Sequence, residues 1–233
     1  SRPVAGGLTY TKTNEDNSLG QLVRSFDSSG QERQFSSDTS GNVETLSVKQ
    51  AGGIFLDTQY SYDAFNRLLT VTSPKNEITT YTYSSTGQLL SIKDPRDKVT
   101  TFEYDLMDRV KKKTNPINQV WEFAYDSNGN MNYLKEPNGD EKTFEYDELD
   151  RLSKKILPDD TYTYAYDVRD NMTLATNNSS SVSFNVDTAG RVTSTSVSGT
   201  GALSDFADYT INYEYNANDS RTRMEDSFGG VTT

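Results

Sequence analysis

The chain has 233 residues and a formal net charge of −11, and it contains neither cysteine nor histidine. These counts exclude disulfides, thiolate metal sites and catalysis by cysteine or histidine, and the acidic charge disfavours binding to nucleic acid. Hydrophobic residues make up only 33% of the chain, but 15 tyrosines and 10 phenylalanines are present, which a disordered chain would lack. We therefore expect a thin core spread along a sheet, in which tyrosine supplies buried area while its hydroxyl stays in water. No apolar run is long enough for a membrane span.

Residues 1–59 contain two turn sequences that resemble each other. Residues 26–31 read FDSSGQ and residues 38–43 read DTSGNV, so each has an aspartate followed three residues later by glycine. Such a segment closes a tight turn, because the aspartate accepts hydrogen bonds from amides ahead of it and glycine tolerates positive φ. The aromatic pair that accompanies this turn later in the chain is eroded here. Residues 1–59 are therefore predicted to be degenerate β-hairpin repeats.

Residues 60–192 repeat the motif aromatic-x-Tyr-Asp at a regular spacing. The spacing is 21 residues with a last step of 20, and the second aromatic lies at Tyr62, Tyr83, Tyr104, Tyr125, Tyr146 and Tyr166. Four residues later only glycine, asparagine or aspartate occurs, the types that tolerate positive φ: Asn66, Gly87, Asp108, Gly129, Asp150, Asp170, Gly190 and Asp219. Each copy is thus predicted to contain an aspartate turn.

A second turn in each copy is marked by proline. These prolines lie twelve residues after the tyrosine, at Pro74, Pro95, Pro116, Pro137 and Pro158, and two residues beyond come Asn76, Asp97, Asn118, Gly139 and Asp160. Proline sets φ for the first corner of a turn and cannot donate to a strand ladder. Each unit therefore reads as two antiparallel strands, with Phe102 and Tyr104 on one face and Thr101 and Glu103 on the other.

Residues 193–233 depart from this spacing. Val186 and Tyr215 occupy the tyrosine column but are 29 residues apart, and residues 194–207 are rich in serine, glycine and alanine. We expect an irregular repeat with a longer loop, followed by one further YD copy.

These columns resemble the YD repeats of the RHS family, which occurs in bacterial polymorphic toxins, insecticidal toxin-complex proteins and animal teneurins. The family signature is similar to Tyr-x-Tyr-Asp-x-x-Gly-Arg-Leu; here residues 60–68 read YSYDAFNRL and residues 144–152 read FEYDELDRL. The resemblance implies a β-sheet strip that spirals into a hollow shell, with a C-terminal core that seals it and, in many members, cleaves off an enclosed toxin. The Asp-Pro-x-Gly motif of that core has no counterpart here, because Asp94-Pro95 lies in a repeat turn. We therefore expect the cargo, the seal and the protease to lie outside these residues.

Two lysine runs, residues 111–113 and 154–155, form the one candidate binding strip. Lys112 and Lys154 both lie eight residues after their tyrosines, and Tyr133 occupies the same column between them. Two repeats correspond to roughly 20 Å of sheet. The candidate glycan-binding residues are Lys112, Lys113, Tyr133, Lys154 and Lys155. An acidic polysaccharide is one reading; we favour the alternative, a solvated strand whose lysines are balanced by Glu103 and Glu145.

Other candidate sites are weaker. The aromatic columns could stack on sugars, but their recurrence at the structural period favours a role as the core of the sheet. The aspartate turns could bind calcium, yet each offers only one or two carboxylates. No convergent catalytic constellation is present, although a lyase that uses tyrosine and arginine is conceivable. We expect no cofactor and no metal.

The sequence thus predicts an all-β array of antiparallel YD hairpins that forms a coiled sheet, because open sheets rarely exceed ~10 strands without curling. The leading functional hypothesis is a non-enzymatic scaffold segment of a large bacterial protein, secreted or at the cell surface. Its partners would be neighbouring repeats and an enclosed toxin or effector domain of the same polypeptide. The alternative is a glycan-binding or cell-adhesion module, and an enzyme comes third.

Overall fold

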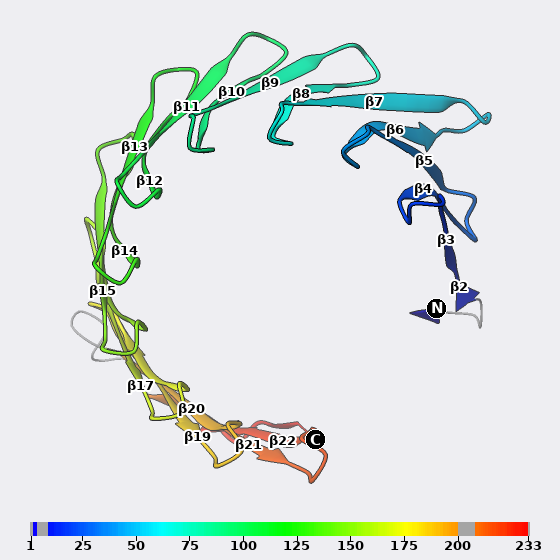
Figure 1. Ribbon diagram of the computed structural model, residues 1–233. Coiled ribbons are helices and arrows are strands. Elements are labelled where there is room, and N and C mark those ends of the chain that lie inside the picture. Colours follow the sequence, from blue (N-terminus) through cyan, green and yellow to red (C-terminus); the bar gives the residue numbers. More distant parts are fainter. Residues whose placement is uncertain (1, 4–8, 200–207, 233) are drawn as a thin grey trace. The chain divides into compact units, whose positions relative to one another are not determined.

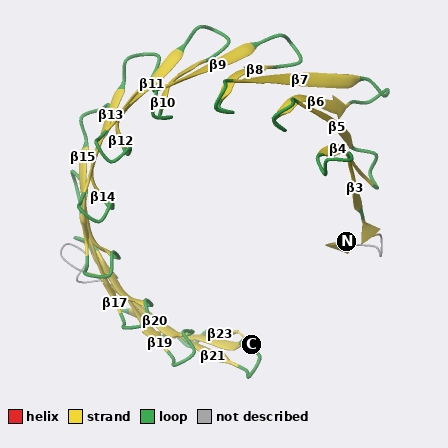
Figure 2. Ribbon diagram, in the orientation of Figure 1, coloured by secondary structure: helices red, strands yellow, loops and turns green. Residues whose placement is uncertain are grey.

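A computed structural model describes residues 2–3, 9–199 and 208–232 (Figure 1). Every regular element in these residues is a β-strand, as Figure 2 shows, and the predicted all-β class is confirmed. The described residues contain no helix that could cross a membrane. The chain divides into two units, residues 1–119 and 120–233, which are described separately. The predicted division into residues 1–59, 60–192 and 193–233 stays a prediction.

The first unit is an antiparallel meander. Its short strands β1 (Arg2–Pro3) and β2 (Thr9–Tyr10) pair with each other. The remaining strands each pair with the next one in chain order. They are β3 (Lys12–Asp16), β4 (Leu22–Asp27), β5 (Glu32–Ser37), β6 (Val43–Lys49), β7 (Phe55–Tyr62), β8 (Leu68–Thr72), β9 (Ile78–Tyr83), β10 (Leu89–Lys93), β11 (Val99–Tyr104) and β12 (Val110–Thr114).

The second unit repeats this arrangement, again with neighbours in sequence paired antiparallel. Its strands are β13 (Val120–Tyr125), β14 (Met131–Lys135), β15 (Glu141–Tyr146), β16 (Leu152–Ile156), β17 (Thr161–Tyr166), β18 (Met172–Thr176), β19 (Ser180–Val186), β20 (Val192–Gly199), β21 (Tyr209–Tyr215), β22 (Arg221–Asp226) and β23 (Val231–Thr232). Strand β20 continues through residue 199, where the sequence predicts a longer loop; residues 200–207 lie outside the described part.

The turns have the backbone that the sequence columns predict. In the turn of residues 63–66, the Asn66 amide donates to the Asp63 carbonyl at 3.0 Å and the Asp63 amide donates to the Arg67 carbonyl at 2.9 Å. This is a three-residue hairpin loop whose last residue requires positive φ. All eight residues of the predicted column have positive φ, from Asp150 at 60° to Gly129 at 98°.

One proline turn differs in conformation from the others. The proline-turn residues Asn76, Asp97, Asn118 and Gly139 have positive φ, but Asp160 does not. In that turn the Leu157 amide donates to the Asp160 carbonyl at 2.8 Å, so the loop is one residue shorter than its neighbours. The missing residue accounts for the single step of 20 in the tyrosine column.

Successive turns of a meander lie at opposite edges of the sheet. We call the edge with the predicted aspartate turns the aspartate edge and the other the proline edge. Residues 38–41 and 63–66 turn at the aspartate edge, whereas residues 27–30 turn at the proline edge, aligned with residues 73–76. The two N-terminal turn sequences therefore share a conformation but not an edge. A turn at residues 17–20, which the sequence analysis missed, closes the first hairpin of the aspartate edge.

Alternating side chains give each unit an aromatic face and a polar face. In β11, Phe102 and Tyr104 are half-buried whereas Thr101 and Glu103 are exposed, as the period of two predicts. We call the side that carries Phe102 and its cross-strand partners the aromatic face, and the side that carries Glu103 the polar face. No apolar side chain of the described residues is fully buried. The sheet of each unit is thus one layer, whose aromatic rings are covered only by their neighbours.

Candidate functional site: the junctions between successive hairpins

Each junction begins with the aspartate of a turn. In the turn of residues 105–108, Asp105 Oδ1 accepts hydrogen bonds from the amides of Met107 and Arg109 at 2.9 and 3.0 Å. Its Oδ2 accepts from Arg109 Nε at 2.8 Å. The backbone amide and the guanidinium of Arg109 hold the pKa of Asp105 below its ordinary value. The aspartate therefore closes the turn and also orients the arginine that follows it.

In six copies of the repeat, the second tyrosine ties its hairpin to the preceding one. The Tyr83 hydroxyl donates to the Leu68 carbonyl at 2.9 Å, and the Tyr104 hydroxyl donates to the Leu89 carbonyl at 2.8 Å. The same bond joins Tyr62 to Val43, Tyr146 to Met131, Tyr166 to Leu152 and Tyr215 to Val192. These hydroxyls do not stay in water, contrary to the expectation from composition. Burial raises the pKa of Tyr83 and Tyr146 accordingly.

This bond explains which aromatic column tolerates phenylalanine. The hydroxyls of Tyr60 and Tyr81, in the first aromatic column, make no hydrogen bond with another described residue, and three regular copies have phenylalanine there. A ring suffices at that position because it only contributes apolar area. At the second position the hydroxyl replaces water on a backbone carbonyl, so tyrosine is favoured, and the copy with Val186 has no such bond.

An arginine ties alternate hairpins to the following one. The Arg67 guanidinium lies over the Tyr83 ring with its carbon 4.8 Å from the ring centroid, and Arg67 Nη1 donates to the Ser84 carbonyl at 2.8 Å. Arg151 lies over Tyr166 at 4.8 Å and pairs with Asp170 at 2.8 Å. Because each guanidinium is also held by the aspartate of its own turn, it bridges two successive turns at the aspartate edge.

The hairpins between them use an amide instead. Gln88 Nε2 donates to Asp108 Oδ1 at 2.5 Å, and Asn130 Nδ2 donates to Asp150 Oδ1 at 2.7 Å. The column runs Arg67, Gln88, Arg109, Asn130, Arg151, Asn171, Arg191 and Ser220. These residues were not among the predicted site residues, although their alternation over two repeats is visible in the sequence. The residue type in this column therefore alternates between arginine and an amide, so the pattern repeats every two hairpins.

The candidate lysine strip is divided between the two faces. Lys112 lies opposite Glu103 and Lys154 opposite Glu145 on the polar face, with ion pairs of 3.1 and 3.0 Å. These pairs are the ones expected in the favoured alternative. Tyr133 shares the polar face with Lys154. Tyr133 lies opposite Thr143, Thr143 is on the same side of its strand as Glu145, and Glu145 lies opposite Lys154.

Lys113 and Lys155 lie on the aromatic face instead, opposite Phe102 and Phe144. The Lys155 ammonium is 5.8 Å from the Tyr162 ring centroid. The strip is also distributed over both units, because residues 112 and 113 belong to the first and residues 133, 154 and 155 to the second. The structure therefore does not gather the five residues on one face, and glycan binding stays a prediction.

The sequence was compared with models of known protein families. The sequence model of a family described as Teneurin YD-shell matches residues 23–167, more than half of the chain. The chain belongs to the teneurin YD-shell family. The predicted membership in the RHS and YD-repeat proteins is confirmed, and the chain is a segment of a YD-shell scaffold. No curated protein sequence matches it.

Solved structures show the same fold for this YD-shell segment. The crystal structure of TcdB2-TccC3-Cdc42 is similar with a TM-score of 0.62 at 13% identity, and that of TcdB2-TccC3-TEV with a TM-score of 0.61 at 13% identity. The Photorhabdus luminescens Tc holotoxin pore with a mutant TccC3 is similar with a TM-score of 0.57 at 12% identity. Each match covers 93% of this chain but only 15% of the other chain.

Proposed function

We propose that this YD-shell segment is part of the wall of a hollow shell in a large bacterial protein, secreted or at the cell surface. The shell would enclose a toxin or effector domain of the same polypeptide, and the segment would do no chemistry itself. The observation that carries the proposal is the repeated junction: a tyrosine–carbonyl bond recurs in six copies, and an arginine or amide bridge accompanies several of them. The similarity in fold to TcdB2-TccC3 structures supports it.

The junctions suit a wall because they act locally. A single layer cannot bury a central core, so its resistance to opening must come from bonds between neighbouring hairpins. The Tyr83 hydroxyl and the Arg67 guanidinium supply such bonds at one junction, and the columns repeat them. A wall built in this way gains area by adding hairpins without changing the chemistry that holds it. The glycan-binding alternative gains no support from contacts, since Lys112 and Lys154 are each neutralised by a glutamate.

The test is protease protection of a domain enclosed by the full polypeptide that carries this segment. We expect the enclosed domain to resist digestion, and a variant with Tyr62→Phe, Tyr83→Phe and Tyr104→Phe to lose that protection at lower temperature. The matched control changes first-column residues, Tyr60→Phe and Tyr81→Phe, whose hydroxyls hold no neighbouring hairpin. The proposal would be contradicted if the enclosed domain were digested equally fast in the unmodified polypeptide and in the variant with the three tyrosine substitutions.

A further inference from the structure

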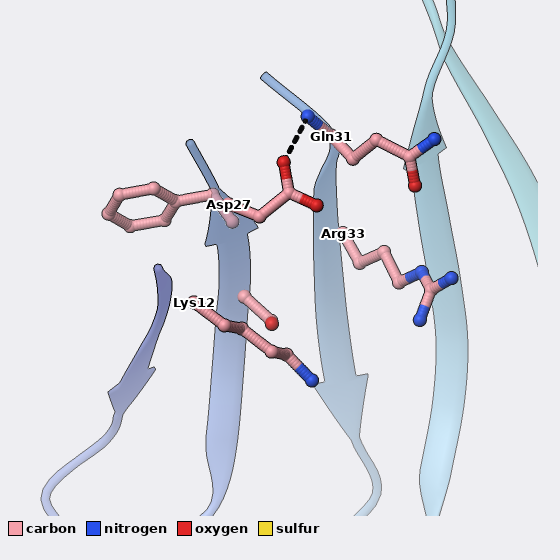
Figure 3. A pocket seen from close by; sticks show the side chains of 6 residues that line it. Lys12, Asp27, Gln31 and Arg33 are labelled. Carbon is pink, nitrogen blue, oxygen red and sulfur yellow. Dashed lines mark hydrogen bonds between the residues drawn. The ribbon is translucent and has the colours of Figure 1, made fainter. Parts of the chain in front are cut away.

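A small recess lies on the aromatic face where β3, β4 and β5 run side by side (Figure 3). Its volume is about 100 Å³, and it is lined by Lys12, Ser25, Phe26, Asp27, Gln31 and Arg33. The strand register places Asn14 opposite Ser25 and Ser25 opposite Arg33, so these side chains share one face with Lys12, two residues before Asn14. Lys12 and Arg33 thus approach the recess from strands on either side of β4.

These two cations have no carboxylate partner among the described residues, in a chain that has 34 acidic and 23 basic residues. The nearby acids are engaged elsewhere. Asp27 Oδ1 accepts from the amides of Ser29 and Gln31 at 2.9 and 3.1 Å, and Figure 3 shows the second of these bonds. Glu32 faces the opposite side of the sheet, where it pairs with Arg24 at 2.7 Å and Lys49 at 3.0 Å. Asp27 itself lines the recess and lies opposite Lys12 in register, so Lys12, Arg33 and Asp27 together leave one net positive charge there.

Ser25 adds a second, independent feature. Its side chain lines the recess, the residue is only 5% exposed, and its hydroxyl makes no hydrogen bond with another described residue. The hydroxyl is not among the fully buried unpartnered atoms of the described residues, so it opens onto the recess, where it can donate a hydrogen bond. The Ser25 hydroxyl is therefore an available hydrogen-bond donor between Lys12 and Arg33.

The first regular hairpin and the strand after it offer one counterpart of the recess. Counted from the aligned turns, Lys12 corresponds to Thr58, Ser25 to Val71 and Arg33 to Thr79. Relative to these three residues, the recess has two positive charges and a hydroxyl in place of neutral side chains, whereas later copies also carry lysine in these columns, at Lys113, Lys142 and Lys155.

We propose that this recess binds one oxyanion group, a carboxylate or a phosphate. The planar guanidinium of Arg33 presents paired N–H donors that match two oxygens of such a group, and the Lys12 ammonium adds a point charge. The Ser25 hydroxyl donates a third contact from below. The volume is that of roughly three water molecules, which suits one small oxyanion group.

The test is an NMR titration of the chain with inorganic phosphate and, separately, with acetate at low ionic strength. We expect saturable shifts at the backbone amides of Ser25, Gln31 and Arg33 with at least one of the two ions. Saturation with phosphate alone assigns a phosphate group, and saturation with acetate assigns a carboxylate. Linear shifts with both ions, spread over exposed lysines and arginines, would overturn the proposal.

A variant that restores the repeat pattern isolates the role of the recess. Lys12→Thr, Ser25→Val and Arg33→Thr together should lower the affinity at least tenfold and leave the thermal midpoint unchanged or higher. The control, Arg96→Thr with Lys98→Thr, removes two exposed cations of the same unit and should leave the affinity unchanged. If the triple variant binds the ion as tightly as the unmodified chain, the proposed site is refuted. If the triple variant does not fold, Arg33→Thr alone is tested, and unchanged affinity in that variant refutes the site.

Discussion

Replacing Tyr83 by phenylalanine removes the hydroxyl that β9 contributes to the junction with the preceding hairpin. The hydroxyl donates to the Leu68 carbonyl at 2.9 Å, while the ring stays beneath the Arg67 guanidinium at 4.8 Å. Packing and most of the cation–π contact are therefore retained. A hydrogen bond contributes about 0.5–1.5 kcal/mol to stability, and leaving a partly buried carbonyl without its partner adds to the loss. We expect Tyr83→Phe to lower the free energy of unfolding by about 1–2 kcal/mol.

The matched control lies two residues earlier. The Tyr81 hydroxyl has no hydrogen-bond partner among the described residues, and other copies of the repeat have phenylalanine in that column. Tyr81→Phe should therefore change the free energy of unfolding by less than about 0.5 kcal/mol. Urea unfolding followed by circular dichroism measures both variants, and for a chain of this length each kcal/mol corresponds to about 2–4 °C in Tm.

Hydrogen exchange locates the effect, because a repeat array need not unfold in one step. Amides of β8 and β9 should exchange faster in Tyr83→Phe than in Tyr81→Phe, and amides of β4 and β5 should not change. Equal losses in the two variants, or no loss in Tyr83→Phe, would refute the idea that the hydroxyl holds the junction.

Four further outcomes follow from the same structure. Gly129 has φ of 98° with open space around a built Cβ, so Gly129→Val should destabilise by about 1–3 kcal/mol through backbone strain alone, and Ser127→Val by much less in the same urea assay. Arg151→Gln removes pairs with Asp147 and Asp170, so amides of residues 146–170 should exchange faster than in Glu148→Gln, which removes an exposed charge from the same turn; equal rates would contradict the bridge. Hydrogen bonds from Arg24 and Lys49 lower the pKa of Glu32 from 4.5 to about 2, and the pKa of Asp105 and Asp147 is also lowered. These acids bind protons at higher pH in the unfolded chain than in the folded one, so the stability they contribute is complete above their unfolded pKa values and is lost as pH falls below about 4 toward 2; a urea midpoint that stays constant down to pH 2 would disprove this. If the lysines bind acidic glycans, Lys112→Glu with Lys154→Glu should abolish retention on an acidic polysaccharide column while Lys75→Glu with Lys98→Glu does not, and failure of the unmodified chain to be retained at low salt removes the hypothesis.

The sequence by itself determined the hairpins and the conformation of their turns. Positive φ at Asn66, Asp108 and Gly129 was predictable because backbone sterics depend on the residue and its immediate neighbours. The alternation of Phe102 and Glu103 between faces was equally predictable, since a strand has a period of two. The short turn at Asp160 was the exception, because a single missing residue changes the loop type while the turn residues remain.

Only the tertiary structure decided which groups meet across hairpins. The partner of the Tyr83 hydroxyl is a carbonyl of the preceding hairpin, and the partner of the Arg67 guanidinium is a ring of the following one. Local rules do not give these contacts, because they depend on the register between strands and on the bulge beside each turn. The same register brings Lys12, Ser25 and Arg33 to one recess from three separate strands. A repeat period specifies each hairpin, but the side chains that fasten hairpins together become visible only when neighbouring hairpins are in place.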